Sequence, residues 1–139
     1  MLDIDRLKSI NDEFGNVEGD RVISHVAEIL RSGVRRVDMV ARWGGEEFLV
    51  LLPDTDIQAA AELAERLRRQ VTANVLRNLE QEARVTVTAG VAILRNRETI
   101  ESTIHRADVA LYQGKRGGRD RIVVAEGDAA PESRSVARA

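Results

Sequence analysis

The chain has 139 residues, of which 43% are hydrophobic, and it carries a formal net charge of −2. This length is enough for one compact domain with its own core and too short for two comfortable ones. The small net charge gives no reason to expect a protein that coats a nucleic acid polymer or a membrane through bulk electrostatics, and the absence of cysteine excludes disulfides, thiolate zinc sites and cysteine nucleophiles. No apolar run approaches the roughly 20 residues that cross a bilayer, so we expect a cytoplasmic domain without membrane contact.

The beginning of the chain predicts one strand and two helices. Residues 1–5 are typical of a strand, and apolar residues at helical spacing follow it as far as Gly15, which can end a helix. A second apolar stripe predicts a helix from Asp20 to about Arg35. Because Asp5 and Asp20 each precede a helical pattern, a helix N-cap is one interpretation of both residues.

A β-hairpin is predicted between residues 40 and 53, because strand-favouring residues lie on both sides of Gly44-Gly45. A Gly-Gly pair is typical of a tight turn that needs positive φ. Glu46 and Glu47 follow this turn. Adjacent strand residues face opposite sides, so we expect one of these carboxylates to turn into a site and the other sideways or outward. Taken alone, the pattern is also typical of a solvated hairpin.

The remaining elements are predicted from the same periodicities. They are candidate N-cap residues at 54–56, a helix over 57–71, a loop over 74–83, a strand over 85–93 with a bulge or close approach at Gly90, a helix over 100–111, a strand over 121–125 and a disordered tail over 126–139. The order β, α, α, β, β, α, β, α, β predicts one α+β domain over residues 1–125. Its helices pack against a mainly antiparallel sheet of ferredoxin-like topology.

Two acidic residues are the first candidates for chemistry. Asp3 ends the first strand, and Glu46 lies at the tip of a hairpin that would pair beside it. Mg²⁺ in nucleotide enzymes is held by one or two carboxylates together with substrate phosphates, because it prefers octahedral oxygen ligands. Two acids from neighbouring strands fit that requirement. The alternative is that they are unrelated surface acids.

Basic residues form a second group of candidates. Lys8 and the run from Lys115 to Arg119 offer cations near the same sheet edge, where they could neutralise phosphate charge. The alternative is an ordinary helix C-terminus, in which basic residues complement the dipole and glycine ends the helix. The two histidines, His25 and His105, are interpreted as surface or boundary residues.

Several separated motifs, in the same order, resemble the GGDEF family of diguanylate cyclases. The resemblance runs from residue 1 to about residue 124, and it rests on Asp3-Ile4-Asp5-Arg6-Leu7-Lys8-Ser9-Ile10-Asn11-Asp12, Gly19-Asp20, Gly44-Gly45-Glu46-Glu47-Phe48, and Ala107-Asp108-Val109-Ala110-Leu111-Tyr112 with Lys115 and Arg119. It implies a nucleotidyl-cyclase-like fold and the condensation of two GTP molecules into cyclic di-GMP with release of two pyrophosphates.

The resemblance also implies a metal site and a phosphate site. Asp3, the carbonyl of Ile4 and Glu46 would hold two Mg²⁺ or Mn²⁺ ions at the GTP phosphates, and Glu47 would assist the 3′-hydroxyl or orient the hairpin. The residues that match the positions gripping the β- and γ-phosphates are Lys8, Lys115 and Arg119. Catalysis would need a homodimer, because each domain binds one GTP and presents it to the other.

Guanine recognition is implied at Asn11 and Asp20. A carboxylate can accept from guanine N1–H and the exocyclic amine together, and adenine offers neither donor there. Gly44 and Gly45 would let the ribose and α-phosphate approach closely, so side chains there should block the substrate.

A second site is implied by the segment from Arg35 to Asp38, which fits the R-x-x-D inhibitory motif of the family and lies five residues ahead of Gly44. Arg35 and Asp38 would bind the product, cyclic di-GMP, with Arg66 as a third contact. The planar fork of arginine suits both guanine and phosphate. An R-x-x-D segment is also common at solvated helix ends.

The sequence departs from the family pattern at several positions. Leu7 replaces a common Phe and Asn16 a common His, while Gly114 and Gly117 replace residues that are often Ala, which predicts a looser phosphate-gripping turn. The leading helix, the D-x-L-T-x-L-x-N-R segment and most of the first strand are absent, so the N-terminal part of the family domain is missing from this sequence. The alternative function is therefore a catalytically inactive module of the same fold that binds GTP or cyclic di-GMP as a regulatory receptor.

Overall fold

The computed structural model describes residues 1–74 and 84–128 of the chain. Its elements, in chain order, are β1 (Leu2–Ile4), α1 (Leu7–Phe14), α2 (Asn16–Gly33), β2 (Met39–Arg42), β3 (Glu47–Leu51), α3 (Ile57–Ala73), β4 (Val87–Val91), α4 (Ile100–Arg116) and β5 (Ile122–Val124). The predicted order of strands and helices is therefore confirmed.

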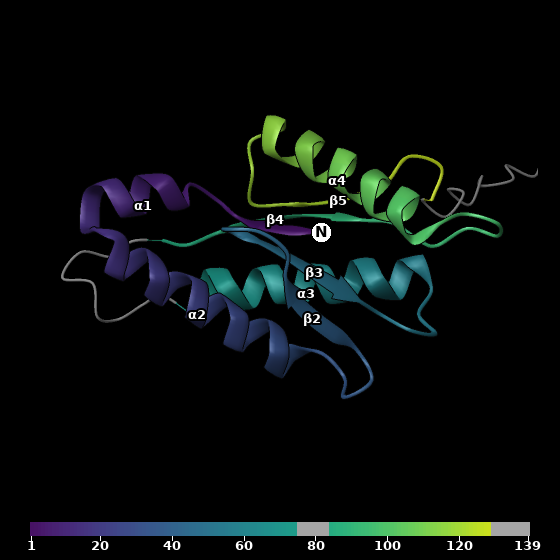
Figure 1. Cartoon of the computed structure of the whole chain (residues 1–139), viewed down its shortest axis with the longest axis horizontal. Helices are drawn as coiled ribbons and strands as arrows, with labels where there is room; N and C mark the ends of the chain where they lie inside the picture. Colours follow the sequence, from purple (N-terminus) through teal and green to yellow (C-terminus); the bar gives the residue numbers. More distant parts are fainter. Residues whose placement is uncertain (75–83, 129–139) are drawn as a thin grey trace, which may run out of the picture.

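The five strands form one sheet in the order β2-β3-β1-β4-β5, with β1 at its centre (Figure 1). All neighbours are antiparallel except β4 and β5, which are parallel. Helix α4 covers one face of the sheet, while α2 and α3 lie on the other, with α1 packed against α2. The predicted α+β fold, with helices on a mainly antiparallel sheet, is confirmed.

Alternation along β1 divides its side chains between the two faces of the sheet. Leu2 and Ile4 are buried in the apolar core with Val22, Val26 and Phe48, on the side of α2 and α3. Asp3 points the other way and pairs with Lys115 of α4. The polar side chain at the centre of the sheet therefore lies beneath α4.

The predicted helix caps at Asp5 and Asp20 are both wrong. Helix α1 begins after Arg6, which has a left-handed φ of 56° and makes no side-chain cap bond, while the carboxylate of Asp5 bonds to the hydroxyls of Thr86 and Thr88. Helix α2 begins at Asn16, so Asp20 lies inside it. By contrast, the candidate cap at 54–56 is confirmed at Asp56, whose side chain accepts from the amide of Ala59 at 2.8 Å.

Two glycine predictions have different outcomes. The predicted close approach at Gly90 is confirmed, because a Cβ there would lie 1.9 Å from the carbonyl oxygen of Ala107 on α4. The predicted positive-φ turn is wrong, because neither Gly44 nor Gly45 has positive φ. Four residues, 43–46, connect β2 to β3. A loop of this length turns the chain without the left-handed geometry of a two-residue hairpin.

The two segments predicted as irregular lie mostly outside the described residues. Residues 75–83 of the predicted loop and 129–139 of the predicted tail belong to those parts of the chain. The packed structure continues beyond residue 125, however. Asp128 is 7% exposed and accepts a hydrogen bond from the amide of Ile93 at 3.0 Å.

Candidate active site

The first strand and the predicted hairpin are neighbours in the sheet, so Asp3 and Glu46 lie near each other. Asp3 on β1 is the register partner of Glu47 on β3, and the amide of Ile4 donates to the carbonyl of Glu46 at 3.0 Å. Partners directly opposite in an antiparallel pair project from the same face, so Glu47 faces the side of Asp3. Glu46, one residue earlier, lies in the connecting loop. The structure thus brings both carboxylates of the hairpin to Asp3, with Glu47 directly across from it.

The Asp3 carboxylate is buried beside a single cation. Its Oδ2 lies 2.9 Å from the Nζ of Lys115, and its side chain is 4% exposed. The pKa of Asp3 is raised to about 6, chiefly by burial and in smaller part by the negative charges of Glu46 and Glu47, while the hydrogen bond and charge of Lys115 act to lower it. Glu46 and Glu47 thus add negative charge around the Asp3–Lys115 pair, and additional positive charge would stabilise the ionised form of Asp3.

The donor chemistry of this cluster fits a Mg²⁺ site that is completed by substrate. Within residues 1–74 and 84–128, no group of three or more His, Asp or Glu residues is placed to enclose a metal ion. Mg²⁺ does not need such a cage, because it retains water and is commonly held by one or two carboxylates plus nucleotide phosphates. Asp3 with Glu46 or Glu47, and the carbonyl of Ile4, are the oxygen donors available for that arrangement.

The hairpin loop is held in shape by Arg42, a residue that sequence reasoning missed. Its Nη2 donates to the carbonyl of Gly45 at 2.8 Å and its Nε to that of Gly44 at 3.2 Å. A Cβ on Gly45 would meet nothing within 4 Å, whereas one on Gly44 would lie 3.0 Å from the Glu47 carboxylate. Gly45 therefore leaves space above the loop. The only local signal was an arginine just before the Gly-Gly pair.

The predicted guanine-reading residues come together through Gly19. A Cβ on Gly19 would lie 1.7 Å from Oδ1 of Asn11, so the Asn11 side chain occupies the space that any other residue at 19 would fill. This Oδ1 is buried and has no hydrogen-bond partner among the described residues. Asp20 follows Gly19 on α2 and is exposed. A buried acceptor without a partner suits a ligand that carries an N–H donor, and the Asp20 carboxylate, one residue after Gly19, is open to solvent.

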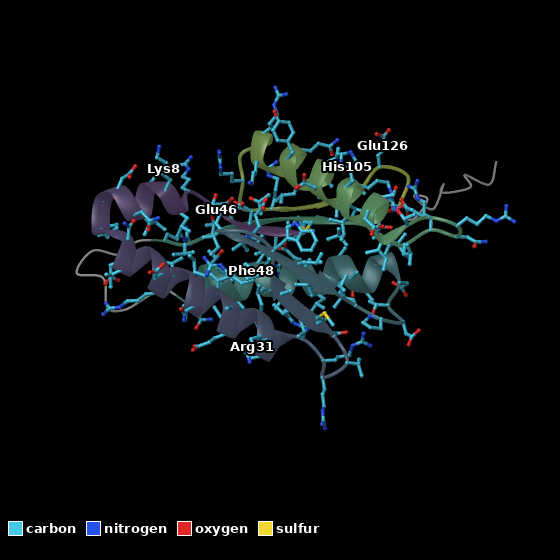
Figure 2. The ribbon with its side chains drawn as sticks, viewed as in Figure 1. Lys8, Arg31, Glu46, Phe48, His105 and Glu126 are labelled. Atoms are coloured by element: carbon cyan, nitrogen blue, oxygen red, sulfur yellow. The ribbon has the colours of Figure 1, made fainter. Side chains whose placement is uncertain are left out.

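The three predicted phosphate-binding cations lie on different elements. Lys8 is exposed in the first turn of α1, Lys115 lies near the end of α4, and Arg119 follows that helix with a left-handed φ of 64°. In the view of Figure 2, Lys8 and Glu46 lie on the same side of the ribbon. Of the three, Lys115 is the one that the structure joins directly to Asp3.

Gly114, one of the two glycines behind the predicted looser phosphate-gripping turn, lies inside α4 and not in the turn that follows it. A Cβ on this residue would lie 2.6 Å from the methyl group of Thr88 on β4. The absence of a side chain therefore lets α4 approach the sheet closely, and the carbonyl of Gly114 accepts from the amide of Arg119 at 3.0 Å. Glycine at this position tightens the contact between helix and strand.

The residues predicted to bind product also lie near one another. Arg35 pairs with Asp38 at 2.9 Å, and its Nη2 also donates to the carbonyl of Pro53 and the hydroxyl of Thr55. The hydrogen bond from Arg35 lowers the pKa of Asp38. Arg66 on α3 donates to the carbonyl of Gly33 at 2.9 Å, two residues ahead of Arg35. Two exposed guanidinium groups and one carboxylate thus lie where α2 ends.

The histidines take no part in either cluster. His105 is exposed on α4, and Nε2 of His25 lies 3.3 Å from the carbonyl of Asn74. Their interpretation as surface or boundary residues is confirmed.

These features define a nucleotide-cyclase-like domain, and comparison with known proteins gives its family. The model of the family described as "Diguanylate cyclase, GGDEF domain" matches residues 1–121, so the chain belongs to the GGDEF family.

Relatives and solved structures agree with this assignment. Diguanylate cyclase DgcP of Pseudomonas aeruginosa is 45% identical over 125 residues, a match that covers 90% of this chain and 19% of that protein. The GGDEF domain of DgcB from Caulobacter crescentus, solved in complex with c-di-GMP, is 38% identical with a TM-score of 0.86, covering 90% of this chain and 75% of that one. The active GGEEF domain of a diguanylate cyclase from Vibrio cholerae is 35% identical with a TM-score of 0.84, covering 89% and 79%.

The chain spans about a fifth of the length of the Pseudomonas aeruginosa relative. Within its described residues, no helix combines the length and apolar character that a bilayer crossing requires.

Proposed function

We propose that this chain is a diguanylate cyclase catalytic domain, which condenses two GTP molecules into cyclic di-GMP and releases two pyrophosphates. The observation that carries the proposal is the cluster around Asp3, where the hairpin carboxylates and Lys115 converge on one buried oxygen pair. This arrangement supplies oxygen donors for a cation and an ammonium group for a phosphate. Family membership and the names of the relatives support the same reaction.

Each residue of the cluster has a role in the proposed reaction. Asp3, the Ile4 carbonyl and Glu46 would hold two Mg²⁺ or Mn²⁺ ions, which when bound offset charge on the phosphoryl oxygens and ease deprotonation of the attacking 3′-hydroxyl. Glu47 is placed to share the carboxylate role, because it lies directly opposite Asp3. Lys8, Lys115 and Arg119 would bind the β- and γ-phosphates and stabilise the leaving pyrophosphate.

The specificity for guanine is assigned to Asn11 and Asp20. The orphaned Oδ1 of Asn11 would accept one donor of the base, and the Asp20 carboxylate the others. ATP would leave these acceptors unpaired, which costs on the order of 1 to 3 kcal/mol. Asp20→Ala should therefore reduce the preference for GTP over ATP, and an unchanged preference ratio would refute this assignment.

The reaction needs two copies of the domain facing each other, because each site holds one of the two GTP molecules. The test therefore uses the chain fused to a parallel dimeric coiled coil, incubated with GTP and Mg²⁺. Cyclic di-GMP and pyrophosphate should appear together, and Glu46→Ala should abolish both. If wild type and Glu46→Ala are equally inactive while cyclic di-GMP still binds, the enzyme proposal fails and a receptor module of the same fold remains.

A second site for the product is proposed at Arg35, Asp38 and Arg66. The grouping of two exposed guanidinium groups with a carboxylate at the end of α2 supports it, because arginine forks can hold guanine or phosphate bidentately. Binding there would allow cyclic di-GMP to inhibit its own synthesis. Arg35→Ala should relieve that inhibition without lowering the initial rate, and superimposable inhibition curves would count against the site.

A further inference from the structure

Asp5 has no role in the reaction proposed above, yet its side chain joins three parts of the fold. It is 5% exposed and lies where the end of β1, strand β4 and the turn after α4 meet. We propose that Asp5 is a positioning residue that holds the phosphate-binding cations Lys115 and Arg119 in place relative to Asp3. This inference rests on the proposed function, because it concerns the triphosphate subsite of that same site.

The first connection runs directly to the turn that carries Arg119. Oδ2 of Asp5 accepts from the amide of Asp120 at 3.0 Å. Gly118, Arg119 and Asp120 have φ values of 115°, 64° and 47°, a left-handed run that residues with a Cβ disfavour. A side-chain contact from α3, Arg68 to Asp120 at 2.5 Å, holds the outer side of the same turn. Asp5 therefore restrains the backbone of a strained turn from within the fold.

The second connection runs through Thr88 to Lys115. Thr88 is fully buried, is the register partner of Asp3, and donates its hydroxyl to Oδ1 of Asp5 at 2.7 Å. This bond fixes the side-chain rotamer, which directs the Thr88 methyl against the backbone of Gly114. Lys115 is the next residue of α4, with its Nζ 2.9 Å from Asp3. The depth at which α4 sits on the sheet is thus linked to Asp5.

The contacts of Asp5 indicate a positioning role and not a metal-binding one. Both of its oxygens already accept hydrogen bonds from neutral donors, since Oδ2 also accepts from the hydroxyl of Thr86 at 2.7 Å. A carboxylate with these three bonds is oriented toward the protein. Its loss should affect the recognition of β- and γ-phosphates and spare the recognition of the base.

The test compares two nucleotides that cannot be condensed, 3′-deoxy-GTP and 3′-deoxy-GMP, titrated with Mg²⁺ against the full chain. Asp5→Ala should lower the affinity of the chain for 3′-deoxy-GTP by about tenfold or more, while its affinity for 3′-deoxy-GMP should stay within about twofold of the wild type. Asp5→Asn keeps one acceptor for the Asp120 amide and should recover most of the loss. Amide hydrogen exchange provides a second measurement, because the exchange of Asp120 should become faster in Asp5→Ala.

A matched control separates positioning from stability. Asp56→Ala removes the N-cap of α3, far from the phosphate site, and should lower thermal stability without changing either nucleotide affinity. If Asp5→Ala does not fold, Thr88→Val provides a second test. It removes one donor to Asp5 while keeping the shape of the side chain, and it should also lower the affinity for 3′-deoxy-GTP. Equal weakening of both nucleotides, or unchanged affinities in the folded variants, would overturn the inference. Failure of the wild type to bind 3′-deoxy-GTP would instead contradict the proposed function itself.

Discussion

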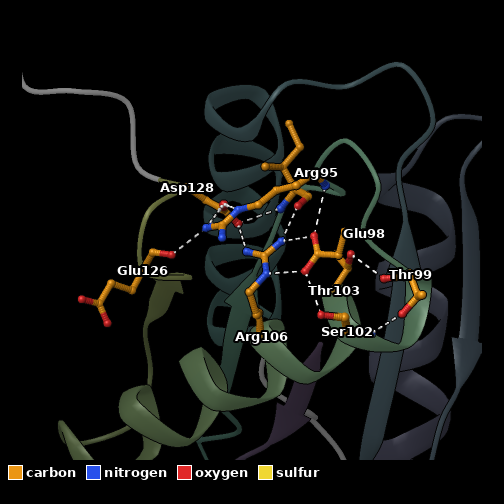
Figure 3. A network of polar contacts seen from close by, with 9 residues as sticks. Arg95, Glu98, Thr99, Ser102, Thr103, Arg106, Glu126 and Asp128 are labelled. Atoms are coloured by element: carbon orange, nitrogen blue, oxygen red, sulfur yellow. Dashed lines mark hydrogen bonds and ion pairs between the residues drawn. The ribbon is translucent and has the colours of Figure 1, made fainter.

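Two clusters of charges, each built around a buried aspartate, differ in how completely their charges are balanced. Around Asp3, the negative charges of Glu46 and Glu47 act on a buried carboxylate that pairs with Lys115, and the pKa of Asp3 is raised to about 6, chiefly by burial. At the far end of α4, Arg95 and Arg106 face Glu98 and Asp128 in a network in which each charge has an opposite partner (Figure 3). The hydrogen bonds from Arg106 hold the pKa of Glu98 well below its usual range. The first arrangement leaves negative charge in excess around Asp3, whereas in the second each charge has an opposite partner.

The balanced network also explains why the chain remains packed beyond β5. Asp128 accepts from Arg95, Arg106 and the amide of Ile93, and Arg106 donates to the carbonyl of Ile93 at 2.6 Å. These bonds tie residues 126–128 to the segment between β4 and α4. Charge density alone therefore does not mark a functional site, and the useful signal is the mismatch between donors and acceptors.

The largest expected effect is on activity, at the unbalanced site. Asp3→Asn keeps the shape of the side chain and removes the charge that the proposed reaction needs, so turnover of GTP by the dimerised chain should fall by at least about 1000-fold. Stability should be maintained or should rise, because the ionised carboxylate is costly in this position. Activity assays and thermal unfolding of the same protein check both parts. A variant that is less stable than the wild type but turns over GTP at the same rate would contradict the functional role assigned to the cluster around Asp3.

The opposite result is expected at the balanced network. Asp128→Ala leaves Arg95 and Arg106 without their shared buried partner, so the free energy of unfolding should fall by about 3 kcal/mol. GTP turnover measured well below the unfolding temperature should change little, because the network lies at the other end of α4. Chemical denaturation and initial rates test this pair of statements. A large loss of rate in a stably folded variant would show that the two regions are coupled.

The two regions should also respond to pH with opposite sign. The folded pKa of Asp3 is raised above its unfolded value, so ionisation destabilises the fold by up to about 3 kcal/mol as pH rises from about 4 through about 6. The pKa of Asp128 is lowered in the fold by its hydrogen bonds, so its stabilising contribution is present above its unfolded pKa and is lost as the pH falls through the folded one.

Denaturation of Asp3→Asn and Asp128→Asn beside the wild type, between pH 3 and 8, measures these contributions. The stability advantage of Asp3→Asn should grow from about pH 4 to 6 and then level off. The loss of stability in Asp128→Asn relative to the wild type should become smaller as the pH falls toward 3. Parallel pH profiles for the two variants would refute the distinction between the clusters.

A smaller effect is expected at Arg42, which shapes the hairpin loop from the surface. Arg42→Met keeps most of the side-chain stem and removes the bonds to the carbonyls of Gly44 and Gly45, so kcat/KM for GTP should fall by about tenfold. The unfolding temperature should hardly change, because the guanidinium is exposed. An unchanged kcat/KM would show that the loop keeps its shape without this residue.

The order of elements was predictable because it depends on local periodicity. Apolar spacing identified each helix, and β-branched residues identified the strand that contains Gly90. The cap at Asp56 was also predictable, since its bond to Ala59 spans three residues. These features need no knowledge of distant parts of the chain.

The wrong predictions arose at residues whose structural role is set by distant parts of the chain and not by their neighbours in sequence. Asp5 resembles an N-cap in sequence, but its carboxylate is bonded to Thr86, Thr88 and Asp120, which lie 81 to 115 residues away. Asp20 also resembles an N-cap in sequence, but α2 begins at Asn16, so Asp20 lies inside the helix. The balanced network was missed for the same reason, since Asp128 and Arg106 meet only after the chain has folded.

The candidate site residues were predicted only through the resemblance of separated motifs. Spacing alone could not show that Asp3 and the hairpin meet, nor that Glu47 and not Glu46 is the register partner of Asp3. Replacing each glutamate separately with glutamine distinguishes their roles, because the residue that holds the metal ion should lose Mn²⁺ affinity and the other should not.

The most direct measurement is the number of Mn²⁺ ions bound to the chain by electron paramagnetic resonance, with and without 3′-deoxy-GTP. The charge imbalance around Asp3 predicts Mn²⁺ binding by the nucleotide-bound wild type, with two ions per chain if the proposed function holds, and a loss of that binding in Asp3→Asn. Equal Mn²⁺ binding by wild type and Asp3→Asn in the presence of the nucleotide would contradict the account.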